Sequence, residues 1–134
     1  MTPRQLRTIG LAALLAAAGA SCGGDDDSPA GPSPGGGTGT VAATITITAS
    51  GVSPSSVTVP IGSRVTFVNN DSRSHTPASD PHPTHGSCPP LDQVGTIQPG
   101  QSRTSGNLNT AGTCTYHDHD LPDSAGLRGT VRVQ

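Results

Sequence analysis

The chain has 134 residues, a formal net charge of −2 and only one phenylalanine, one tyrosine and no tryptophan. Its positive charge comes from seven scattered arginines, so we expect no nucleic-acid partner. No glycine-rich phosphate loop follows a strand and nothing marks an oxyanion hole, so the sequence does not indicate an enzyme.

The N-terminal segment is typical of an export signal. Arg4 and Arg7 precede an apolar run over residues 9–18, which is too short to span a bilayer but suits the hydrophobic part of a secretory signal. We therefore predict a signal peptide over residues 1–21 and an exported mature chain.

The small residues before Cys22 resemble a bacterial lipoprotein cleavage box, in which the cysteine becomes the lipidated N-terminus. Gly19 stands where that box usually carries leucine. The resemblance implies a lipid anchor on the periplasmic or cell-surface face of a bacterial membrane. An ordinary signal cleavage is the alternative, and it would leave Cys22 as an odd free thiol. Residues 23–40, which follow Cys22, contain no large apolar side chain. We therefore expect residues 22–40 to form a flexible tether.

The remainder, residues 41–134, has strand periodicity. Apolar residues alternate with threonines over residues 41–50, and the same period of two returns at 55–71, 112–118 and 129–134, with Pro and Gly between the runs. No window has a helical stripe. The pattern predicts one all-β domain, a small Greek-key β-sandwich.

Two cysteines, Cys88 and Cys114, lie in this domain. In an exported protein they are expected to pair. A disulfide that closes so long a loop contributes on the order of 3 to 4 kcal/mol, and an oxidised Cys114 has no thiolate for a metal.

The histidines form three clusters, each close to aspartates: His75, then His82 and His85, then His117 and His119. Neutral imidazole is the commonest metal ligand, so this spacing points to a transition-metal site. The alternative is that they are solvated loop residues, since Pro, Asp and Gly surround most of them.

Several segments look like a cupredoxin. Residues 49–76 resemble the first half of that family, in which a strand and an Asn/Asp turn precede the first copper-ligand histidine, here His75. Residues 97–120, with PGQS and TAGT, and residues 125–133 resemble its second half. The resemblance implies a cupredoxin-type sandwich, bound copper and electron transfer with a redox partner protein.

The resemblance also allows the copper ligands to be compared. Aligned on TAGT, Asp118 falls where the family has its ligand cysteine, and Leu127 falls at the axial methionine. The family's second ligand histidine is expected near residues 121–123, but this chain has Leu, Pro and Asp there. The only histidine nearby is His119. In this register the thiolate is missing.

A second register uses the CxxH spacing of Cys114 and His117, with His75 as the third ligand. It requires Cys88 to be unpaired, and it makes the gap from His117 to Leu127 longer than such loops allow.

Without a thiolate, imidazole and carboxylate ligands suit Cu(II) or Zn(II). Copper is the expected cofactor and zinc the alternative. Binding should weaken below about pH 6, because imidazole must be neutral to ligate. Prolines stiffen the loop that carries two less favoured candidates, His82 and His85. The favoured ligands are His75, His117, Asp118 and His119.

Two functions therefore follow from the sequence. One is a membrane-tethered, copper-binding protein of cupredoxin type with an electron-carrier role. The other is a cupredoxin-like domain that has lost the redox centre and acts as a structural or metal-handling surface module.

Overall fold

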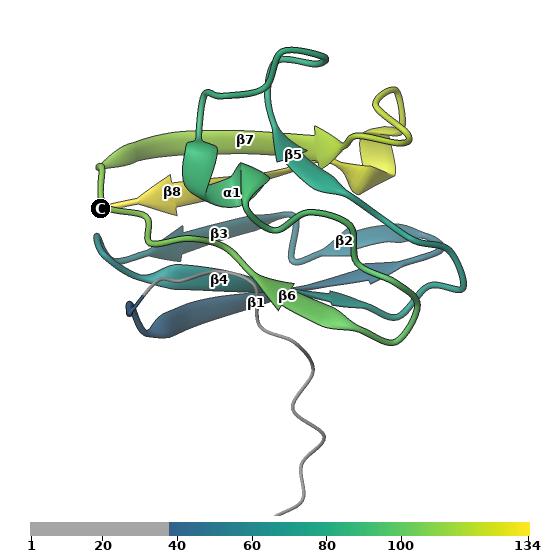
Figure 1. The fold of residues 1–134 in the computed structure, drawn as a ribbon, viewed down its shortest axis with the longest axis horizontal. Helices are drawn as coiled ribbons and strands as arrows, with labels where there is room; N and C mark the ends of the chain where they lie inside the picture. The colour runs from purple at the N-terminus through teal and green to yellow at the C-terminus, as the bar shows by residue number, and fades with distance from the viewer. Residues whose placement is uncertain (1–37) are drawn as a thin grey trace, which may run out of the picture.

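The computed structural model describes residues 38–134. The expected signal over 1–21, the lipidation site Cys22 and most of the 22–40 tether lie outside the described residues. Within them, the strands form two four-stranded sheets packed face to face (Figure 1). The first, in the order β2-β1-β4-β6, consists of β1 (Val41–Thr48), β2 (Gly51–Ser53), β4 (Arg64–Asn69) and β6 (Ser102–Thr104). The second, in the order β3-β8-β7-β5, consists of β3 (Ser56–Val59), β5 (Pro77–Ser79), β7 (Gly112–Asp118) and β8 (Gly129–Val133).

The alternating sequence pattern accounts for the core between the sheets. In β4 every second residue is buried, and β1, which pairs with it in parallel, buries Ile45 and Ile47 on the same face. From the opposite sheet Tyr116 packs edge-to-face on Phe67, with ring centroids 5.3 Å apart. The predicted all-β sandwich is confirmed.

The predicted disulfide is present. Cys88 and Cys114 are bonded, with their Cα atoms 5.6 Å apart. Cys88 immediately precedes a single helical turn, α1 (Pro89–Asp92), and Cys114 lies in β7. The bond therefore ties the segment after β5 to a central strand of the second sheet.

The short elements were not predicted. Strands β2, β5 and β6 have three residues each, which is too few for a period of two to stand out from the sequence. The same holds for α1 and for the 3-10 turn η1 (Ala125–Leu127). Across residues 38–134 no helix is both long and apolar enough to cross a membrane.

Candidate metal centre

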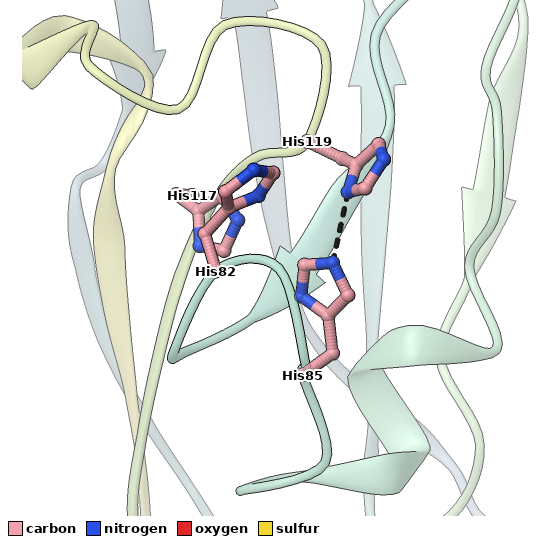
Figure 2. A group of neighbouring side chains, drawn as sticks. All are labelled: His82, His85, His117 and His119. Carbon is pink, nitrogen blue, oxygen red and sulfur yellow. Dashed lines mark hydrogen bonds between the residues drawn. The ribbon is translucent and has the colours of Figure 1, made fainter.

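Four histidines meet on the side of β7 that faces away from the core. Strand alternation turns Cys114 and Tyr116 into the core and His117 to the opposite side. After β5, which pairs antiparallel with β7, the chain folds back as a loop over residues 80–88. Figure 2 shows the rings on this loop turned toward the end of β7. One ligand nitrogen from each ring lies within 4.8 Å of the other three, and these four residues are called the four-histidine site: His82, His85, His117 and His119.

His117 is the buried member of the site, at 1% exposure. Its Nδ1 lies 2.7 Å from Oδ1 of Asp80. Partial burial tends to raise the pKa of Asp80, but hydrogen bonds from Thr115 and His117 outweigh it and hold the pKa below its ordinary value. The carboxylate of Asp80 thus accepts a hydrogen bond from the Nδ1–H group of His117. The other nitrogen, Nε2 of His117, is buried without a hydrogen-bond partner among residues 38–134.

His85 and His119 are linked directly. Nδ1 of His85 is 2.8 Å from the carbonyl oxygen of Ser79, so it donates and leaves Nε2 as the acceptor in the neutral ring. That Nε2 lies 2.8 Å from Nδ1 of His119, the bond drawn in Figure 2. His85 adopts the left-handed backbone conformation, with φ at 51°, which helps to turn its ring back toward β7.

His82 completes the site from the solvent side. Its ring centroid is 5.4 Å from that of His117 and 5.1 Å from that of His119. Desolvation by these neighbours, followed by repulsion from His119, His117 and His85, lowers the pKa of His82 from its ordinary value of 6.5. The lowered pKa keeps a lone pair of His82 available for a metal.

The arrangement fits a divalent transition metal. A tetrahedral zinc site with bonds of about 2.0 Å separates its ligand nitrogens by about 3.3 Å. The distances between the four ligand nitrogens are at most 4.8 Å and must shorten when one ion binds. The side chains of His82 and His119 are exposed and can move to allow this. Asp80 behind His117 and the Ser79 carbonyl behind His85 orient two rings in the way that outer-shell partners orient metal-ligating histidines.

His75 and Asp118 are placed elsewhere. Nδ1 of His75 is 2.5 Å from Oδ2 of Asp118, and its Nε2 is 3.0 Å from Oδ2 of Asp71. Both nitrogens can donate at once only when the ring carries two protons. The hydrogen bond to His75 is the main factor that lowers the pKa of Asp71. Each ring nitrogen of His75 therefore faces a carboxylate oxygen in this pairing.

A small pocket of about 140 Å³ borders His75 and its second partner, Asp71. It is lined by His75, Asp71, Leu121 and Leu127, among others. Leu127, at which the resemblance expects the axial ligand, is buried in η1. His75 and Leu127 thus line one pocket, and hydrogen bonds to carboxylates occupy both ring nitrogens of His75.

The expected ligand set is thus divided. The structure brings His117 and His119 together, and it joins them with the two less favoured histidines, His82 and His85. It keeps His75 and Asp118 on the inner side of β7, as a separate pair. The alternative register with Cys114 as a thiolate is contradicted, because Cys114 is bonded to Cys88.

Sequence reasoning missed Asp80 as the partner of His117. One signal was present: His85 stands three residues before Cys88, and His117 stands three residues after Cys114. A disulfide between those cysteines brings the two histidine pairs to one place. The outward direction of His117, opposite to Tyr116 in the strand, points to the same grouping.

No protein-family model matches the sequence, and no curated protein matches it. Several solved structures are similar. A purple cupredoxin from Nitrosopumilus maritimus is 24% identical with a TM-score of 0.57, and the match covers 69% of this chain and 99% of that one. An oxidised amicyanin mutant is 23% identical with a TM-score of 0.54, covering 69% and 82%. A Cu(I) amicyanin mutant is 20% identical with a TM-score of 0.53, covering 71% and 82%. The chain has the cupredoxin fold.

Proposed function

We propose that this protein is exported, tethered to a bacterial membrane through Cys22, and binds one Cu(II) or Zn(II) ion at the four-histidine site. The proposal rests on Nε2 of His117. This buried nitrogen has no hydrogen-bond partner among residues 38–134, and its ring lies beside three other imidazoles. Leaving such an atom unsatisfied costs about 1 to 3 kcal/mol. A metal ion offsets this cost and uses the neutral form of the ring that Asp80 already orients.

The ligand type favours metal handling over the electron transfer that the fold suggests. Four imidazoles suit Cu(II) and Zn(II), whereas a blue-copper centre needs a thiolate. Both cysteines of the domain are consumed by their disulfide. His82 and His119 are exposed, so a bound metal is open to ligand exchange with solvent or with an acceptor protein.

Calorimetric titration of the purified protein with Zn(II) and with Cu(II) tests the proposal. One equivalent should bind, and His117→Ala should weaken binding by at least about tenfold, because one of four ligands is lost. His75→Ala is the matched control, since it removes a buried histidine outside the site and should leave the affinity unchanged. No binding by the parent protein would refute the proposal.

A further inference from the structure

The disulfide and the four-histidine site share the same two chain segments. His85 and Cys88 lie on the 80–88 loop, separated by Gly86 and Ser87, and Cys114 and His117 lie on β7 with the same spacing. The disulfide therefore joins the loop and the strand three residues from a candidate ligand on each side.

The loop has few other attachments to β7. At its start, the amide of Asp80 donates to the carbonyl oxygen of Thr115 at 3.1 Å, and the carboxylate of Asp80 accepts from Nδ1 of His117 at 2.7 Å. Farther along, His85 approaches His119 through one imidazole hydrogen bond, and that bond uses a nitrogen that a metal would need. At the far end of the loop the disulfide joins Cys88 to β7, and Asp92 of α1 holds Ser79 of β5 through hydrogen bonds of 2.7 and 2.9 Å. The disulfide is thus the covalent link between the loop that carries His82 and His85 and the strand that carries His117.

A cleft borders this bond. Both cysteines line a cleft of about 320 Å³, together with the turn over residues 107–113 that leads into β7. The cysteines are largely buried but not sealed, with 5% and 9% exposure for Cys88 and Cys114.

We propose that the Cys88–Cys114 disulfide is a reducible control element of the four-histidine site, opened by a dithiol that enters this cleft. The inference rests on the proposed metal binding. One thiolate of the dithiol attacks a sulfur and forms a mixed disulfide, and the other protein sulfur leaves as a thiolate and takes a proton. The second thiol of the reductant then resolves the mixed disulfide. The dithiol is oxidised by two electrons, and the protein gains two thiols.

Opening the bond loosens the loop relative to β7, so a metal must order His82 and His85 when it binds. That ordering cost weakens binding, which we expect to fall by at least about tenfold. Linkage requires the reciprocal effect: the metal stabilises the oxidised form by the same factor. A tenfold change corresponds to about 30 mV in the potential of a two-electron couple.

The first test measures Zn(II) affinity by competition with a coloured chelator. The oxidised protein is compared with Cys88→Ala/Cys114→Ala, which mimics the open state without new thiol ligands. We expect at least tenfold weaker binding in the double variant. Val59→Ala is the control, because it removes a buried core contact in β3, away from the site, and should leave the affinity unchanged. Equal affinity in the double variant would overturn the inference.

The second test uses the native protein and does not depend on the variant folding. Dithiothreitol should reduce the disulfide at neutral pH without denaturant, and resistance to it would contradict access through the cleft. In a glutathione redox buffer, excess Zn(II) should lower the reduction potential by about 30 mV or more. No shift would overturn the inference, provided that the oxidised protein binds zinc. If the oxidised protein binds no zinc, it is the proposed function that fails.

Discussion

Asp80 and His117 form a carboxylate–imidazole pair across the gap between the 80–88 loop and β7, with Oδ1 and Nδ1 2.7 Å apart. The pair fixes which nitrogen of His117 carries the proton. It therefore turns the lone pair of Nε2 toward the other three rings, where no hydrogen-bond donor from residues 38–134 meets it. The loop supplies both two of the candidate ligands and the residue that orients a third.

This pair leads to a prediction for Asp80→Asn. The amide keeps the size of the side chain but loses the charge that stabilises the Nδ1–H tautomer. Metal affinity should fall by about 10- to 100-fold, as is typical when an outer-shell partner is removed. Calorimetric zinc titration measures the change. Asp123→Asn is the control, because it removes the same charge from an exposed neighbour of His82 without breaking a hydrogen bond to a ligand. Equal losses in the two variants would mean that charge alone, and not orientation, is responsible.

The His75–Asp118 pair should be structural. Both side chains are almost fully buried, and removing His75 leaves Oδ2 of Asp118 without its partner, while Oδ1 keeps the amide of Asp120 at 2.9 Å. His75→Ala should reduce the free energy of unfolding of the metal-free protein by about 3 kcal/mol. Urea unfolding measures this. The zinc affinity of the folded variant should change by less than about twofold, because the pair lies outside the four-histidine site. Loss of metal binding in this variant would instead locate the metal at the inner face of β7.

Stability should also depend on pH through Asp71. Its hydrogen bond to His75 lowers the pKa of Asp71 below its ordinary value of 3.8. The unfolded chain therefore takes up this proton first as the pH falls. The stabilisation is fully present above about pH 4 and is lost as the pH falls through the lower, folded-state pKa. In urea unfolding, the difference between the parent protein and Asp71→Asn should shrink below pH 4. A difference that stays constant with pH would contradict this linkage.

The proposed anchor can be tested separately. Replacing Cys22 with Ser should release the protein from the membrane fraction, because serine cannot accept the thioether-linked lipid. Fractionation followed by immunoblotting measures the distribution, with Ser28→Ala in the same segment as the control. Retention of the Cys22→Ser variant in the membrane fraction would contradict lipid anchoring.

The fold was predictable because the long strands carry their own signal. In β4, for example, Val65 and Phe67 alternate with polar or partly exposed residues, and the structure buries both. The disulfide followed from the small number of cysteines in an expected export context. Strand β5 was not predictable, because three residues show no period and its pairing with β7 depends on contacts distant in sequence.

The candidate site was only partly predictable. The spacing of His117 and His119 marked them as a pair, but the family resemblance favoured His75 as their companion. The position of His82 and His85 depends on a loop that folds back over β7, and local sequence patterns do not report such tertiary placement. Likewise, the carboxylates that occupy both nitrogens of His75 come from separate segments, at Asp71 and Asp118.

Nitrogen-15 NMR of the histidine rings during a Zn(II) titration shows which imidazoles bind the metal. Long-range proton–nitrogen spectra report each ring nitrogen and its tautomer. At one equivalent of Zn(II), we expect large shifts for ligating nitrogens of His82, His85, His117 and His119, with Nε2 of His117 among them. The nitrogens of His75 should keep their positions, since that ring stays bound to Asp118. A large shift of His75 with none at His117, or no shift at any of the five histidines, would rule out metal binding at the four-histidine site.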